Sequence, residues 1–536
     1  MMGLKQRIVD RSKQALLQPS VLRWVTDDRV MKATEGLLDA RTRVRDAWQV
    51  LIKGTELPNV DPALDENIGR TEREVTVSKS NGHATNGHTN GHATNGHANG
   101  TANGASNGAA RHELADRDGS SDMAESMKER TSLASVGGKD VFEKAFKFMA
   151  ADNARKMGIY PYFRPLDFAD GPEAQINGKR VVMFGSNNYL GLTTHPKVRE
   201  AAKQAIDKYG TSMTGSRLVN GSMRLHEEFE EKLAKWFNKE AALVFTTGYQ
   251  VNIATLAALL SNKQTTAFID RNVHASLYDG VRLGQSAGAK LVRYRHNDAE
   301  SLDKALEKLE ADEGAFVITD GVFSAEGEIA KLDELVPVVK KHKARLFVDD
   351  AHALGVIGPG GMGTAAHFGL LDQVDLVGGT FSKSMASIGG WLVGERKVLD
   401  YIRHFAPSFM FAAAAAPPSV AAAMAAFDVM QEEPWRIDKL RENFTYMREG
   451  LKSLGFELGH TQTAVIPIYI RQDLRTIMMW RDLLEEHGIY TNPFISPGVP
   501  PKSAMLRTSY MATHERHHLD RALEAFEKVG KKYKVI

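Results

Sequence analysis

From about Asp140 onward, short apolar runs of strand length alternate with segments long enough to form helices. Strands that are apolar throughout are typical of a parallel sheet covered on both faces by helices. The sequence therefore predicts an α/β domain with a mainly parallel central sheet, in which ligands bind beyond the carboxyl ends of the strands. The runs are Val181–Phe184, Ala242–Phe245, Thr266–Ile269, Ala315–Ile318, Leu346–Val348 and Asp375–Val377.

Residues 1–77 are predicted to form a helical N-terminal extension. Apolar side chains recur at roughly helical spacing between Leu16 and Ile52, and Gly54 and Pro58 end the pattern. Two interpretations are open. These basic amphipathic helices could dock on a membrane surface or a partner, or they could form a hairpin that packs on itself or on the catalytic part, as amphipathic helices usually do.

Residues 78–130 are predicted to be a disordered linker. Seven Asn-Gly pairs begin at Asn81, and no apolar side chain larger than alanine follows before Leu114. Such a segment cannot bury enough apolar surface to offset the entropy lost on ordering. The four histidines among the Asn-Gly pairs, His83, His88, His92 and His97, lack the spacing of a metal site, so no metal is expected.

Composition excludes several classes of function. The 536-residue chain has no cysteine, so it forms no disulfide and offers no thiolate, and its net charge of +2 gives no indication of nucleic-acid binding. Charged residues interrupt the N-terminus from Lys5 to Lys13, which leaves no room for the apolar core of a secretory signal. We therefore expect a cytoplasmic protein, with peripheral attachment to the inner face of the membrane as an alternative.

Two motifs at strand ends present groups suited to binding a ligand. Gly248 and Tyr249 follow an apolar run and open a helix, whose free N–H groups and positive dipole end suit a phosphate. His274 follows the next run. Each motif alone is weak, because any turn between a strand and a helix can carry glycine or histidine.

Two further motifs bring ionisable groups to strand ends. Asp349 and Asp350 directly follow a buried run, where carboxylates are costly unless something pairs with them. With His352 they are too few to make a convincing metal site. Lys383 lies among the small and hydroxyl residues that follow Thr380, and partial burial would lower its pKa and make its amine a better nucleophile.

Together these motifs resemble the α-oxoamine synthases, a family of pyridoxal-phosphate (PLP) enzymes of fold type I. The sequences at residues 186–192 and 214–217 support the resemblance, which covers about residues 140–536. It implies a homodimer built from an N-terminal segment at 131–185, a large PLP-binding domain at 186–420 and a smaller C-terminal α+β domain at 421–536. The segment at 131–185 contains an amphipathic helix marked by Val141, Phe142, Ala145, Phe146 and Met149.

The resemblance implies that Lys383, His274 and Asp349 are catalytic. Lys383 would bind the cofactor covalently and later move the Cα proton of the amino acid. Asp349 would pair with the pyridine nitrogen, and His274 would stack on the ring and orient the reacting groups. His352 and Ser324 would bond the side of the ring that carries the hydroxyl.

The remaining implied site residues bind the phosphate and the substrate. Gly248, Tyr249 and Thr380 would hold the cofactor phosphate. Asn187 and Arg507 would bind the amino-acid carboxylate, for which a guanidinium group is geometrically matched.

Within the family, the segments 379–384 and 506–514 look most like the bacterial serine palmitoyltransferases. The expected reaction joins L-serine to a long-chain acyl-CoA with loss of CO2 and gives 3-oxosphinganine. Alternatives are the 8-amino-7-oxononanoate synthase and glycine C-acetyltransferase reactions, and an acyl carrier protein could replace CoA. Outside this reaction class, a non-catalytic partner subunit and an aminotransferase or aldolase of the same fold remain open.

Two positions depart from the family pattern. The family usually has a hydroxyl residue shortly before the Pro-Pro pair, where it reaches the phosphate of the neighbouring subunit, but here Ala412–Ala416 precede Pro417. A glycine is common three residues after the lysine, where this chain has Ala386. We expect these changes to affect affinity or substrate range and not the chemistry.

Overall fold

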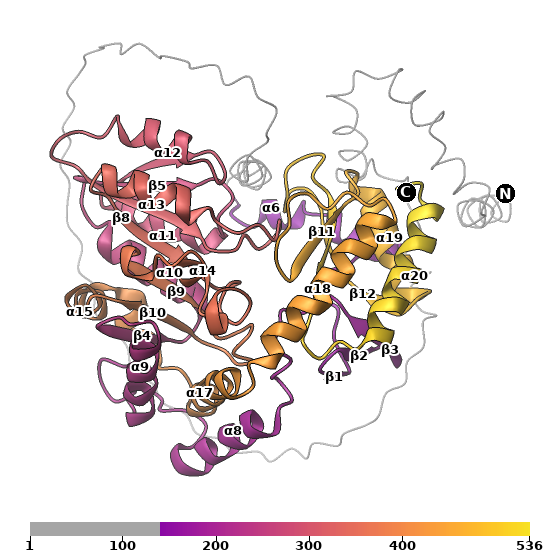
Figure 1. The fold of residues 1–536 in the computed structure, drawn as a ribbon, viewed down its shortest axis with the longest axis horizontal. Helices are drawn as coiled ribbons and strands as arrows, with labels where there is room; N and C mark the ends of the chain where they lie inside the picture. The colour runs from indigo at the N-terminus through magenta and orange to yellow at the C-terminus, as the bar shows by residue number, and fades with distance from the viewer. Residues whose placement is uncertain (1–139) are drawn as a thin grey trace, which may run out of the picture.

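The computed structural model describes residues 140–536, drawn in colour in Figure 1. The predicted helical extension and the predicted linker both lie outside the described residues. The larger part of the molecule is built on a seven-stranded sheet with the strand order β4-β10-β9-β8-β7-β5-β6. Its strands are β4 (Ala241–Phe245), β5 (Thr265–Asp270), β6 (Lys290–Tyr294), β7 (Gly314–Asp320), β8 (Arg345–Asp349), β9 (Leu376–Thr380) and β10 (Gly390–Gly394).

Most of this sheet is parallel, as predicted. Strands β9, β8, β7, β5 and β6 pair in parallel, and only β10 runs antiparallel to its neighbours β9 and β4. All five residues of β9 are buried, as expected for a central strand with helices on both faces. Five helices follow or precede these strands: α9 (Arg224–Trp236), α10 (Gly248–Leu259), α11 (Ala275–Ser286), α12 (Ala299–Leu306) and α13 (Leu332–Lys341).

The sequence pattern placed one strand in the wrong sheet and missed two strands of the seven-stranded sheet. The run Val181–Phe184, expected in the main sheet, is largely β3 (Lys179–Met183), which belongs to a separate four-stranded sheet. Strand β6 was not predicted, because it is an edge strand whose Lys290 and Arg293 interrupt the apolar run. Strand β10 escaped because a glycine at each end gives it a weak strand pattern.

The smaller part contains two sheets. In the first, β1 (Phe168–Asp170), β2 (Glu173–Ile176) and β3 are joined by β12 (Ile489–Tyr490), which pairs in parallel with β3. The second is antiparallel, with β14 (Met505–Ser509) between β11 (Val465–Tyr469) and β13 (Asn492–Phe494). The first strands of the described chain therefore pair with its C-terminal region.

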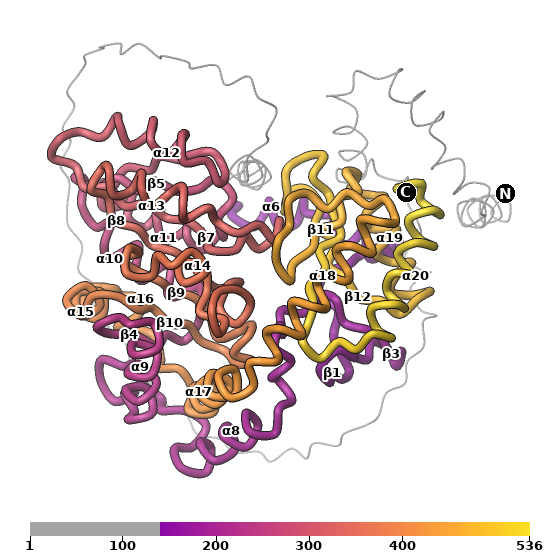
Figure 2. Tube along the Cα trace, in the orientation of Figure 1, coloured from indigo at the N-terminus to yellow at the C-terminus, as the bar shows by residue number. Residues whose placement is uncertain are grey.

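Three helices accompany these two sheets: α18 (Trp435–Ser453), α19 (Asp473–Glu485) and α20 (Arg516–Lys532). In Figures 1 and 2 the smaller part lies beside the larger one; α17 (Pro417–Glu432) lies with the larger part, and α18 leads from there across the smaller part. Helix α17 packs against α8 (Pro196–Tyr209).

The amphipathic helix expected near residue 141 is two short helices, α6 (Glu143–Phe146) and α7 (Ala150–Lys156). Neither helix has a buried residue, and Phe142 and Phe146 are 67% and 74% exposed. The apolar side chains face solvent in the single chain. Because none of them is buried, tertiary packing does not stabilise one longer helix here. None of the helices between residues 140 and 536 has the length and apolarity needed to cross a membrane.

The sheet places six strand ends along one edge, those of β4 to β9. Strands β5, β7, β8 and β9 run in one direction, and β4 shares that direction because β10 is antiparallel to both β4 and β9. The pairing sets Asp320 opposite Asp349, and Asp349 opposite Gly378. This edge is where an open α/β sheet binds its ligands.

Candidate active site

A cavity of about 320 Å³ lies at the carboxyl ends of the strands. It brings together residues that are far apart in the sequence and that follow β4, β5, β8 and β9. Seven of the predicted site residues line it: Gly248, Tyr249, His274, Asp349, His352, Thr380 and Lys383.

One end of the cavity has the donors that a phosphate needs. Helix α10 begins at Gly248, and its N-cap Thr247 accepts a hydrogen bond from the Gln250 amide. A Cβ at position 248 would come within 2.6 Å of Thr380 Cβ, so glycine allows the helix to start close to the end of β9. The Thr380 hydroxyl lies 2.8 Å from the Ser382 hydroxyl. Backbone N–H groups and hydroxyls thus converge at a helix N-terminus.

A fixed carboxylate lies elsewhere in the same cavity. Asp349 is 6% exposed, and one of its oxygens accepts a hydrogen bond from Asn252 Nδ2 at 2.7 Å. The other oxygen accepts from the Ala351 amide at 3.0 Å. The same Asn252 nitrogen donates to Ser276 Oγ at 2.7 Å, which fixes the amide. These bonds hold the Asp349 carboxylate in a fixed orientation, as a partner for a protonated ring nitrogen must be.

His274 lies between the strand end and the cavity. It is the N-cap of α11, and its Nδ1 lies 2.7 Å from Ser276 Oγ. Its backbone N–H donates to Asp320 Oδ2 at 3.1 Å. Burial lowers the pKa of His274, and the Asp349 carboxylate acts in the opposite direction.

Lys383 lines the cavity from the turn that follows β9. Burial lowers the pKa of its amine to about 8, against the opposing effect of the Asp349 carboxylate. A lysine in this state supplies a neutral amine far more readily than an exposed lysine.

The other predicted residues lie beside the cavity and not in its lining. Arg507, which is 4% exposed, donates from Nε to the Ser324 carbonyl at 2.6 Å and from Nη2 to Asn187 Oδ1 at 3.1 Å. Tyr189 links Asn187 to His352, because its hydroxyl lies 3.3 Å from Asn187 Oδ1 and 2.6 Å from His352 Nδ1. A chain of hydrogen bonds therefore runs from the guanidinium to the cavity wall.

Sequence reasoning assigned no role to Asn252, Asp320 or Tyr189. Asn252 comes one helical turn after Gly248, which was a usable signal. Asp320 ends β7 as Asp349 ends β8, and burial together with the Asp349 charge raises its pKa well above the usual range. Burial also raises the pKa of Tyr189, to about 12, so its hydroxyl stays protonated.

The residues present fit PLP. The helix N-terminus and the Thr380 hydroxyl suit its phosphate, Asp349 suits its ring nitrogen, and the amine of Lys383 suits its aldehyde. Glycine at 248 lets these backbone N–H groups lie close to Thr380, because a Cβ there would clash with the Thr380 side chain.

Comparison with known proteins agrees with this geometry. The family described as aminotransferase class I and II matches residues 179–526. The chain belongs to this family. The more specific expectation is also confirmed: this chain is a PLP-dependent α-oxoamine synthase, an acyltransferase of fold type I.

Two relatives and one solved structure show how far the likeness extends. A serine palmitoyltransferase of Sphingobacterium spiritivorum is 42% identical over 73% of this chain and 97% of its own length. An 8-amino-7-oxononanoate synthase of Thermoanaerobacter pseudethanolicus is 39% identical over 72% of this chain and 96% of its own. A serine palmitoyltransferase variant of S. paucimobilis, solved with bound PLP and myriocin, has a TM-score of 0.70 and 33% identity, covering 74% of this synthase and 98% of its own chain.

Proposed function

We propose that this α-oxoamine synthase joins L-serine to a long-chain acyl-CoA, releases CoA and CO2 and forms 3-oxosphinganine. Four relatives named serine palmitoyltransferase, at 40–43% identity over almost their whole length, support this substrate pair. The structural observation that carries the proposal is the cavity shared by Lys383, Asp349 and His274. Such a product would place the enzyme in sphingolipid biosynthesis.

The chemistry needs an amine, a base and a fixed carboxylate. PLP, when bound, supplies an electron sink for the negative charge that develops at the amino-acid Cα. With PLP bound, Lys383 would hold the aldehyde carbon, and once the amino group of the substrate replaces it, its free Nζ would take the Cα proton. Asp349 would pair with the ring nitrogen and favour its protonated form, and His274 would stack on the ring and orient the acyl carbonyl.

The remaining residues bind and orient. Gly248, Tyr249 and Thr380 would hold the phosphate at the start of α10, and His352 and Ser324 would bond the hydroxyl side of the ring. Arg507 and Asn187 bind the substrate carboxylate. The hydrogen bond already formed between these two side chains holds the guanidinium in place, which favours this role.

We also propose that two copies assemble around the site. Exposed apolar side chains include Val219 at 75%, Ile388 at 55% and Phe411 at 73%, and Ile388 also lines the cavity. A second copy would bury this surface, as the resemblance to homodimeric enzymes leads us to expect. The alanine run 412–416 offers no hydroxyl for a contact with the phosphate of the neighbouring subunit.

For the rest of the chain, we propose a helical extension at residues 1–77 and a linker at 78–130 that let a cytoplasmic enzyme attach peripherally to membranes. Beyond them, we propose an N-terminal catalytic segment at 131–185, a large domain at 186–420 and a small domain at 421–536. Co-sedimentation with anionic vesicles tests the attachment, because deleting residues 1–130 should abolish it and leave turnover intact. Equal sedimentation of both chains would contradict it.

A free-thiol assay tests the substrates. We expect CoA release with L-serine and palmitoyl-CoA that exceeds release with alanine or glycine and with acetyl-CoA, and that disappears in Lys383→Ala. A preference for alanine with a shorter acyl thioester would instead support 8-amino-7-oxononanoate synthase activity, which the relative of that name at 39% identity makes the second candidate. Absence of turnover with every pair would favour a non-catalytic subunit.

A further inference from the structure

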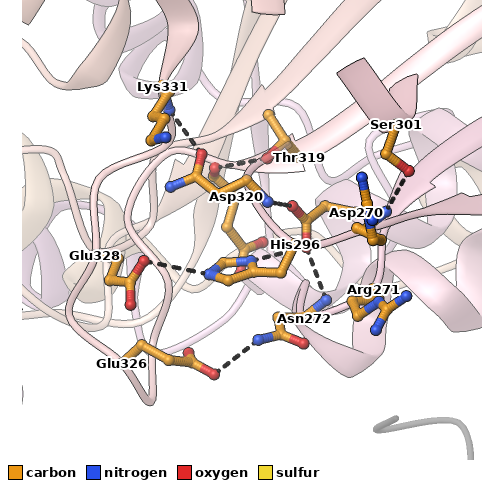
Figure 3. A network of polar contacts seen from close by, with 12 residues as sticks. Asp270, Arg271, Asn272, His296, Ser301, Thr319, Asp320, Glu326, Glu328 and Lys331 are labelled. Carbon is orange, nitrogen blue, oxygen red and sulfur yellow. Dashed lines mark hydrogen bonds and ion pairs between the residues drawn. The ribbon is translucent and has the colours of Figure 1, made fainter. Parts of the chain in front are cut away.

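A buried polar cluster lies next to the active site and has no role in the proposed chemistry. Figure 3 shows its centre, His296, whose Nδ1 lies 3.1 Å from Asp270 Oδ1 and whose Nε2 lies 3.5 Å from Glu328 Oε2. The ring of Phe323 meets the imidazole edge-on, with ring centroids 4.3 Å apart. His296 thus bridges the end of β5 and the hairpin that follows β7.

The cluster holds a largely buried histidine between two carboxylates. Burial alone would lower the pKa of His296, but the carboxylates of Asp270 and Glu328 outweigh it and raise the pKa to about 10. The His296 interaction also lowers the pKa of Glu328. The imidazolium is therefore held between two carboxylates, and removing it would leave the fully buried Asp270 without its cation.

On one side, the cluster fixes the turn that presents His274. Asp270 accepts hydrogen bonds from the backbone N–H of Asn272 at 2.8 Å and from the backbone N–H of Asn297 at 2.7 Å. Two residues further on, the His274 amide donates to Asp320. The turn from 270 to 274 is thus tied by its backbone to carboxylates at the ends of β5 and β7.

On the other side, the cluster fixes the hairpin at residues 322–329. The hairpin is closed by the pairing of Val322 with Ile329, and Asn272 Nδ2 donates to Glu326 on it at 3.0 Å. The hairpin also carries the Ser324 carbonyl that accepts from Arg507.

The hairpin tip reaches the smaller part of the molecule. The Gly327 carbonyl accepts from the Gln462 amide and from Thr463 Oγ1, both at 3.0 Å. A Cβ at position 327 would come within 2.0 Å of the Val465 carbonyl at the start of β11, so the approach is close. The hairpin thus joins β11 and Arg507 to the turn that presents His274.

We propose that His296 is a positioning residue that couples the turn presenting His274 to the hairpin that supports Arg507. Through His296, Arg507, which binds the amino-acid carboxylate, and His274, which stacks on the cofactor, are held in a fixed relative position. The inference rests on the proposed function for the roles of Arg507 and His274. The mechanical coupling itself rests only on the contacts of the cluster.

The test compares His296→Gln and Glu328→Gln with a matched control, His342→Gln. His342 also pairs with an aspartate, Asp303, at 2.6 Å, but this pair joins the end of α13 to α12 and not the turn to the hairpin. The full-length protein is used throughout. If His296→Gln fails to fold, Glu328→Gln retains the shape of the side chain and still weakens the cluster.

The first measurement is amide hydrogen exchange in the cofactor-free protein. In both cluster variants we expect peptides covering 270–276 and 322–330 to exchange about 10-fold faster, which corresponds to roughly 1.4 kcal/mol, while the control matches the wild type. Unchanged exchange in both peptides would overturn the proposal. This result does not depend on PLP.

The second measurement is a spectral titration of the PLP-loaded protein with L-serine, normalised to bound cofactor. We expect the apparent Kd for L-serine to rise in both cluster variants. In the free-thiol assay we expect kcat to fall and kcat/KM to be lower by about 10- to 100-fold. A purely structural role would reduce the amount of loaded protein and leave both constants per loaded site unchanged, which would overturn the proposal. If the wild type binds no PLP, the proposed function fails, and the exchange measurement alone decides the coupling.

Discussion

The reactivity of Lys383 depends on the fraction of its amine that is neutral near physiological pH. Burial lowers its pKa to about 8, while the charge of Asp349 pulls in the opposite direction. At pH 7.5 roughly a quarter of such amines are neutral, against roughly 0.1% for a lysine of ordinary pKa. The position is therefore suited to attack on an aldehyde without a separate base.

Capture of PLP by the cofactor-free protein should follow this titration. Because only the neutral amine attacks, the rate should rise about 10-fold per pH unit below pH 7 and level off above about pH 9. Asp349→Asn should move the midpoint to lower pH, since the lost carboxylate is the charge that raises the Lys383 pKa. Stopped-flow absorbance measures the rate, and a midpoint near pH 10 would contradict the buried amine.

Ala386 has a backbone conformation that favours glycine. Its φ is 52°, and its amide donates to the Lys383 carbonyl at 2.9 Å. A non-glycine residue in this region costs about 1–2 kcal/mol, and glycine adds about 0.4–1 kcal/mol of entropy to the unfolded chain. The structure thus gives a reason for the glycine common in the family at this position.

Ala386→Gly should therefore raise the free energy of unfolding by up to about 1 kcal/mol, measured by urea denaturation. Ala287→Gly is the control, because Ala287 is exposed with a φ of −94°, and there the same change should destabilise the protein. A loss of stability in both variants would show that residue 386 is not strained.

The start of α10 is the element on which phosphate binding depends most. In Gly248→Ala the new Cβ would lie 2.6 Å from Thr380 Cβ, so the helix start must move away from the end of β9. We expect PLP affinity to fall at least about 10-fold, measured by equilibrium dialysis. Gly314→Ala is the matched control, because its nearest neighbour would be 3.9 Å away. Equal affinities in the two variants would exclude α10 as the phosphate site.

The elements also show what the sequence could predict. Strands β4, β5, β7, β8 and β9 carry apolar patterns strong enough to be read directly, and the motifs at their ends converge as expected. The placement of β3 was wrong because a local pattern does not say which sheet a strand joins. Asn252 and Asp320 went unassigned because their importance comes from partners 97 and 46 residues away in the chain.

For the molecule as a whole, the exposed apolar surface around Phe411 predicts an assembly of two chains. Phe411→Asp would place a charge in that interface, so we expect the particle mass to fall from twice the 59.0 kDa chain mass toward that of one chain. Light scattering coupled to size exclusion measures the mass. Leu474→Asp, at a 46% exposed position on α19, is the control and should stay dimeric. A monomeric wild type would contradict the proposed assembly.

The attachment point of PLP can be measured directly. Borohydride reduction of the PLP-loaded protein, followed by digestion and peptide mass spectrometry, locates the lysine bonded to the cofactor. We predict the pyridoxyl mass on the peptide containing Lys383 and its loss in Lys383→Ala. A label on another lysine, or no label on the loaded wild type, would contradict the assignment of this cavity as the catalytic site.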